Sequence, residues 1–175
     1  MLTDIIDLDP AQLQHPARFY GFNSFLVLGK DVSLHSAGAI SSQRPAAVSI
    51  ISSNNTESLI RLVKKFDIIY STTYDASPAL LTRVATAKRK ALVNVSDILG
   101  KEGADRAQMM HRISRFLEFC RSYRVEAVFA SMAKDELGIR GSQETADIFS
   151  LLGVDREQTR YSYSVINDVS WTGRE

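Results

Sequence analysis

Six short runs of β-branched and other apolar residues recur along the chain, and this alternation limits the possible folds more than any other feature. Runs that stay apolar at consecutive positions are typical of strands covered on both faces of a parallel sheet. A spacing of roughly 20 to 35 residues leaves room for a crossover helix between most pairs. The predicted strands are residues 4–8, 24–28, 47–51, 67–70, 91–95 and 125–129. The pattern predicts an α/β fold, either an open doubly wound sheet or a closed β/α barrel, and periodicity does not separate the two.

Helix signals fall in the intervals between these runs. Asn54 is followed three residues later by Glu57, as in a capping box, and Asp155 with Gln158 repeats that pattern. Pro78 stands at a first helical position, where proline is favoured. These signals predict helices in the intervals between the strands, as crossover connections require.

The longest predicted helix covers residues 104–122 and has one apolar face. That face contains Met109, Met110, Ile113, Leu117 and Cys120, with Arg112 and Arg115 pointing the other way. We interpret the face as core. The segment from Val32 to Pro45 is rich in Ser, Ala and Gly and has little periodicity, so we expect a loop or a degraded element there.

Composition indicates one globular domain over residues 1–175. The chain is 45% hydrophobic and 23% charged, which excludes a compositionally disordered protein. Its single cysteine, Cys120, excludes an internal disulfide framework and fits a reducing compartment. We find neither a basic leader typical of a signal peptide nor an apolar run of about 20 residues that could cross a membrane. We therefore expect a cytoplasmic protein without membrane contact.

The sequence lacks the common signatures of catalysis. It contains no GxSxG, Walker loop, GxGxxG after a strand, CxxC or HExxH motif. Its three histidines, His15, His35 and His111, are far apart, whereas a hydrolytic metal cluster needs several imidazole and carboxylate ligands that converge. We predict no catalytic residue and no metal site on the polypeptide.

Positive charge is concentrated in the middle of the chain. Residues 1–53 carry a net charge of −1, residues 54–124 carry +6 and residues 125–175 carry −4. Such segregation can attract phosphates while the rest of the surface stays neutral or acidic. The alternative is a set of solvated helix faces, and for the cluster Lys88-Arg89-Lys90 it is an interaction with the negative end of a helix dipole.

The strongest motifs lie towards the C-terminal end, in a succession of helix, strand, polar loop and helix. They are Tyr123-Arg124 at a helix end, Ala130-Ser131-Met132-Ala133 at a strand end, Arg140 in a Gly-flanked loop, and Leu151-Leu152-Gly153 at the next helix end. Together with residues 53–71 and the basic cluster at 88–90, they resemble the barrel subunit of archaeal and eukaryotic ribonuclease P, named component 3 in archaea. The resemblance covers about residues 46 to 166. It departs from the family at Ser142 and Glu144, where members commonly have Pro and Asp.

The resemblance implies a TIM-like barrel, complete or abbreviated, of the type found in polymerase-and-histidinol-phosphatase (PHP) hydrolases. The first strand of those hydrolases supplies closely spaced His ligands, whereas here it offers Asp4, Asp7 and Asp9 and no His. The implied function is that of a non-catalytic subunit of ribonuclease P, the endoribonuclease that removes the 5′ leader from precursor tRNA. In that family the RNA performs the hydrolysis with bound Mg²⁺, and the polypeptide holds no cofactor.

The implied partners are the ribonuclease P RNA, protein component 2 and the other holoenzyme subunits, with precursor tRNA contacted indirectly. The residues that we predict to contact RNA are Lys88, Arg89, Lys90, Arg106, Arg124 and Arg140. An ion pair of Arg140 with Glu136 or Glu144 is the alternative for that residue. Two other functions stay open at this point: a free-standing PHP-like metal-dependent hydrolase, and a protein-interaction scaffold without RNA contact.

Overall fold

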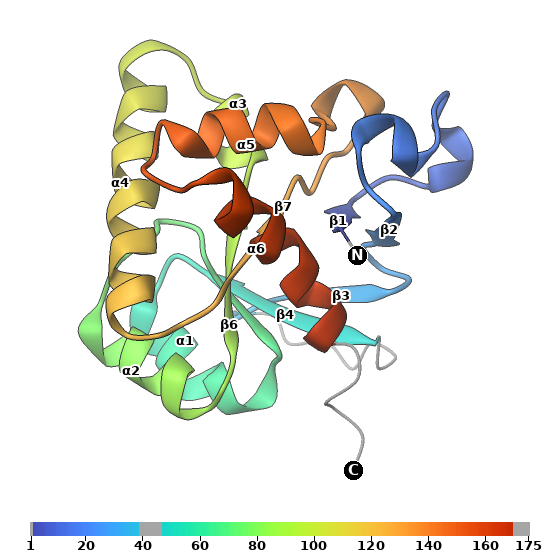
Figure 1. The fold of residues 1–175 in the computed structure, drawn as a ribbon. Helices are drawn as coiled ribbons and strands as arrows, with labels where there is room; N and C mark the ends of the chain where they lie inside the picture. The colour runs from blue at the N-terminus through green and yellow to red at the C-terminus, as the bar shows by residue number, and fades with distance from the viewer. Residues whose placement is uncertain (1, 39–46, 170–175) are drawn as a thin grey trace.

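Seven parallel strands form two sheets in the computed structural model, which describes residues 2–38 and 47–169 (Figure 1). The smaller sheet pairs β1 with β2, and the larger has the order β3-β4-β5-β6-β7. The strands are β1 (Thr3–Ile6), β2 (Ser24–Val27), β3 (Val32–Ser36), β4 (Val48–Ser53), β5 (Ile68–Ser71), β6 (Lys90–Asn94) and β7 (Ala127–Ala130). All six predicted strands are present, which confirms the α/β class.

Helices connect most successive strands of the larger sheet. They are α1 (Thr56–Leu62), α2 (Pro78–Thr86), α3 (Ser96–Leu99), α4 (Gly103–Ser122), α5 (Ser142–Ser150) and α6 (Arg156–Val169). Short 3₁₀ turns supplement them: η1 (Pro10–Gln12), η2 (Ala17–Tyr20), η3 (Val63–Lys65) and η4 (Glu136–Gly138). The helix α1 packs on β4 and α2, and α6 packs on β7, β1 and α5 (Figure 1). Among residues 2–38 and 47–169, none of the helices combines the length and the hydropathy of a membrane span.

The segment from Val32 to Pro45, expected as a loop or degraded element, begins with a strand, so that prediction was wrong for β3. This strand pairs in parallel with β4 from Val32 opposite Val48 to Ser36 opposite Ser52. As the last strand of the larger sheet it has a single described neighbour in that sheet, so backbone hydrogen bonds and one buried valine are enough to hold it. Residues 39–46 of the segment lie outside the described residues.

The two sheets meet at both ends. After β2 the chain turns at Gly29, whose φ of +82° is in the region that favours glycine, and Gly29 N–H donates to the Val32 carbonyl at 2.8 Å. On the other side, Met132 N–H donates to the Ile5 carbonyl and Asp7 N–H donates to the Ala133 carbonyl, each at 2.8 Å. The described strands nevertheless form two sheets and not one closed sheet.

Helix termini agree with the sequence signals except at α1. The helix begins one residue later than predicted, because Asn55 and not Asn54 accepts the Ser58 N–H through its side-chain oxygen, at 3.1 Å. Pro78 is the first residue of α2, and the Asp155 carboxylate accepts the Gln158 N–H at 2.7 Å before α6. The predicted face of α4 is in the core, with Met109, Ile113, Leu117 and Cys120 buried and Met110 partly buried.

Candidate nucleic-acid interface

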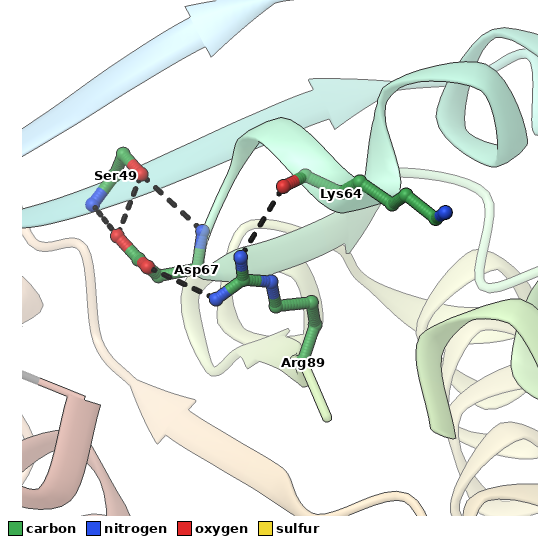
Figure 2. Close-up of polar contacts among 4 residues, drawn as sticks. All are labelled: Ser49, Lys64, Asp67 and Arg89. Atoms are coloured by element: carbon green, nitrogen blue, oxygen red, sulfur yellow. Dashed lines mark hydrogen bonds and ion pairs between the residues drawn. The ribbon is translucent and has the colours of Figure 1, made fainter. Parts of the chain in front are cut away.

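Arg89 lies in the turn between α2 and β6 and is tied to the protein by its guanidinium group (Figure 2). Its Nη1 is 3.5 Å from Asp67 Oδ1, and its Nη2 donates to the Lys64 carbonyl at 3.2 Å. Asp67 is held in turn by Ser49, whose backbone N–H and hydroxyl donate to Oδ2 at 2.9 and 2.6 Å. Arg89 therefore links the turn before β6 to the segment before β5, and Asp67 extends the link to β4 through Ser49. Part of the Arg89 charge is neutralised by Asp67.

Lys90, the first residue of β6, is also engaged. Its ammonium group contacts the carboxylate of Glu126, which immediately precedes β7, and the Tyr161 hydroxyl donates to the same carboxylate. The ammonium group is thus directed across the sheet edge towards β7. It contributes less to an external positive field than the sequence cluster suggests.

Lys88 and Arg124 differ from their neighbours because both side chains are exposed and neither has a described hydrogen-bond or ion-pair partner. Both residues follow a helix in the left-handed conformation, with φ of +54° for Lys88 and +57° for Arg124. At each position the helix closes with paired backbone bonds, such as Val125 N–H to the Cys120 carbonyl at 2.8 Å. Two unpaired cations therefore project from the ends of α2 and α4.

The six predicted residues divide between two edges of the sheet. Lys88, Arg89 and Lys90 precede or begin β6, and Arg124 precedes β7, so these four lie where neighbouring parallel strands begin. Arg106 is in the first turn of α4 and, by helical rise, is roughly 27 Å from Arg124. Its Nε donates to the Lys101 carbonyl at 2.6 Å. The structure thus brings four of the six together and separates Arg106 and Arg140 from them.

Arg140 lies beyond the end of β7, as expected for the loop after a strand. Its Nη1 donates to the Leu137 carbonyl at 2.7 Å, and it lines a pocket of about 400 Å³ together with Asn94, Ser96 and Lys134. Ligands of α/β proteins commonly bind at this edge, outside the carboxyl ends of the strands. The lining combines the two cationic side chains of Arg140 and Lys134 with the carboxylate of Asp135, which accepts the Gly138 N–H at 2.7 Å, and with neutral hydrogen-bonding groups.

The alternative ion pair of Arg140 is not formed with either glutamate. Glu144 accepts the Gly141 N–H at 3.1 Å at the start of α5. Glu136 accepts the Tyr20 hydroxyl at 2.5 Å and the Gln14 N–H at 3.1 Å, and these hydrogen bonds lower the pKa of its carboxyl group to about 2. Because both carboxylates have other donors, the Arg140 guanidinium keeps its charge available.

A buried carboxyl group at the strand ends was not singled out from the sequence. Asp4 of β1 is fully buried, and its two oxygens accept the backbone N–H and the hydroxyl of Ser131 at 2.7 and 2.6 Å. Burial raises the pKa of Asp4 to about 7 against the opposing effect of these hydrogen bonds. An acidic residue inside an apolar strand was the available signal, and its partner, 127 residues away, was not predictable.

A second polar cluster lies where β5 and β6 end. Asp97 Oδ2 accepts the hydroxyls of Tyr70 and Tyr74 at 2.6 and 2.7 Å, and its Oδ1 accepts the Asn94 amide at 3.2 Å. Burial and the nearby carboxylate raise the pKa of both tyrosines, so the phenols remain protonated donors. Every group in this cluster has a partner, which is typical of a structural network.

We find no group of three or more His, Cys, Asp or Glu side chains placed to hold a metal ion within residues 2–38 and 47–169. His111 is exposed on α4, while His35 is on β3 and His15 stacks on Phe19 near η2. The three rings belong to separate parts of the fold.

Comparison with known proteins gives a likeness of fold. No family model matches the sequence, and no curated protein matches it either. Among solved structures, a chain from the cryo-electron microscopy structure of archaeal ribonuclease P with mature tRNA superimposes with a TM-score of 0.71. The match covers 97% of this chain and 81% of the other, at 11% sequence identity. The two chains therefore share a fold over 97% of this chain.

Proposed function

We propose that this chain is a protein subunit of ribonuclease P, equivalent to component 3 of the archaeal enzyme. The observation that carries the proposal is the fold likeness to a chain of an archaeal ribonuclease P complex over 97% of this chain. The loop, strand-end and basic motifs that resemble the same family support it independently. The fold likeness and the sequence motifs both fit a role in ribonuclease P. The assignment to component 3 in particular rests on the sequence motifs.

The two sheets are, in this proposal, parts of one abbreviated β/α barrel. The backbone bonds from Met132 to Ile5 and from Asp7 to Ala133 support this arrangement, since they join the end of β7 to β1. The Asp4 to Ser131 contacts reinforce the same junction. The strand ends of both sheets would then surround one common face, where Arg140 lies.

The proposed role is architectural and electrostatic, and the polypeptide itself is non-catalytic. In the holoenzyme the RNA would hold Mg²⁺ and cleave precursor tRNA, while this chain and component 2 would bind the RNA, in the cytoplasm. Exposed Lys88 and Arg124 would neutralise phosphates at one edge of the sheet, and Arg140 would do so at the other. Arg89 and Lys90 would act mainly by holding that first edge in place.

Binding of an archaeal ribonuclease P RNA at several salt concentrations tests this role. Each phosphate contact that is lost makes binding less dependent on salt. In the double variant Lys88→Gly/Arg124→Gly, the slope of the logarithm of the association constant against the logarithm of salt concentration should therefore fall in magnitude by about 2. Glycine suits both left-handed positions, so the fold is retained. The control is Arg156→Gln, because Arg156 is an exposed cation already paired with Asp147. Binding that does not depend on salt, or an unchanged slope in the double variant, would contradict the role.

A further inference from the structure

A cavity of about 330 Å³ lies at the edge where the strands begin, between the end of α4, the start of β7 and α6. Its inner wall is apolar and is formed by Leu117, Val125 and Phe129, which are between 1% and 8% exposed. Its polar lining includes Arg121 and Arg124, with Gln158 and Tyr161 from α6. Small-molecule pockets span about 300 to 1,000 Å³, so this cavity fits a ligand no larger than one nucleotide.

The charge around the cavity is positive. Arg124 has no described partner, and Arg121 uses one nitrogen to donate to the Gln158 side-chain oxygen at 3.1 Å, which leaves its other donors available. Glu126 is the acidic residue in the lining, and it is already engaged by the Lys90 ammonium and the Tyr161 hydroxyl. An anionic ligand would therefore meet two guanidinium groups and a neutralised carboxylate.

The backbone at Arg124 gives a further reason to assign the side chain a role. Its φ of +57° lies in the left-handed region, where a residue with a Cβ atom is less favourable than glycine. Attraction to the negative end of the α4 dipole offsets part of that cost. An unpaired arginine at such a position suits a residue that is needed for its guanidinium group.

We infer that the cavity binds a single unpaired nucleotide of RNA, an inference that rests on the proposed function. The base lies over the exposed ring of Tyr161 beside the apolar wall. The phosphate is bound by Arg124 and Arg121, since guanidinium groups form paired hydrogen bonds to phosphate oxygens. Proteins recognise unpaired RNA by receiving splayed-out bases on aromatic or apolar surfaces. The apolar side chain of a protein partner would fit the same wall, but it would leave both arginines unused.

Titration of the full chain with 5′-nucleoside monophosphates, followed by amide NMR shifts, tests the assignment. We expect shifts concentrated in residues 120–127 and 158–162, and much weaker shifts with inorganic phosphate or with nucleosides alone. Arg124→Gly should weaken nucleotide binding about tenfold, because charge-assisted hydrogen bonds are lost while the backbone conformation is favoured. Arg160→Ala is the control, since Arg160 is exposed on α6 but does not line the cavity, and it should change binding less than about twofold.

Absence of shifts around the cavity, or equal affinity of Arg124→Gly and the unsubstituted chain, would overturn the inference. Cleavage of precursor tRNA by a reconstituted ribonuclease P, measured in parallel, keeps the two proposals apart. A chain that stimulates cleavage but binds no nucleotide would refute the cavity alone. A chain that binds nucleotides but neither binds the catalytic RNA nor stimulates cleavage would refute the subunit role instead.

Discussion

Replacing Arg89 by alanine should destabilise the protein, although the residue looks in sequence like one more member of a basic surface cluster. Its ion pair with Asp67 joins side chains that are 32% and 22% exposed, and a pair of this kind contributes about 1 kcal/mol. The hydrogen bond to the Lys64 carbonyl adds about 1 kcal/mol. Asp67 keeps its bonds from Ser49, so the carboxylate is not left unpaired. The expected loss in the free energy of unfolding is therefore about 2 kcal/mol.

Urea denaturation followed by circular dichroism measures this loss, and a thermal midpoint lower by roughly 4 to 8 °C should accompany it. Lys88→Gly removes the same charge from the preceding residue, where the side chain is exposed, and should leave stability unchanged or slightly higher. A double-mutant cycle with Asp67→Ala isolates the pair itself. The structural role would be refuted if the free energy of unfolding of Arg89→Ala were within about 0.5 kcal/mol of that of the unsubstituted chain, or if the cycle showed no coupling between Arg89 and Asp67.

Three further predictions concern the core, the helix ends and the buried carboxyl group. Phe149→Ala should cost about 3 to 5 kcal/mol in urea denaturation, because the buried ring stacks on Phe129 with centroids 3.9 Å apart; a cost below 1 kcal/mol would contradict that packing. Arg124→Gly should leave the free energy of unfolding within about 1 kcal/mol while weakening RNA binding, so equal losses in both assays would count against a binding role. Asp4 has a pKa of about 7 in the folded protein and a lower one when unfolded, so the folded state holds the extra proton between these values and stability falls as pH rises from about 4 to about 7. Asp4→Asn should remove that part of the pH dependence, which is on the order of 4 kcal/mol. Parallel curves of unfolding free energy against pH for the two proteins would contradict this prediction.

The elements that sequence predicts well are those specified by neighbouring residues. The strands β4 and β5 each contain an Ile-Ile pair within a short run rich in β-branched and aromatic residues. The starts of α2 and α6 depend on a local proline and a local capping carboxylate. The strand β3 was missed because its position at the end of the larger sheet requires few apolar side chains. The arrangement of the described strands in two sheets was not predictable from periodicity, since an open sheet and a barrel have the same pattern.

In the candidate interface, too, sequence predicted what depends on neighbouring residues and missed what depends on distant ones. Sequence identified a basic cluster but could not tell that Arg89 is tied to Asp67 and Lys90 to Glu126 while Lys88 is exposed. Those differences depend on strand register and on a partner up to 36 residues away. The cavity beside Arg124 was likewise missed, because its wall is assembled from α4, β7 and α6 only in the folded chain.

Cleavage of precursor tRNA at low Mg²⁺ by an archaeal ribonuclease P RNA with protein component 2, measured with and without this chain, tests the subunit role most directly. If the role is correct, the chain increases cleavage only when the catalytic RNA is present, and Arg140→Ala reduces the increase. If the chain adds nothing in a system that an authentic component 3 stimulates, the likeness to ribonuclease P is one of fold alone.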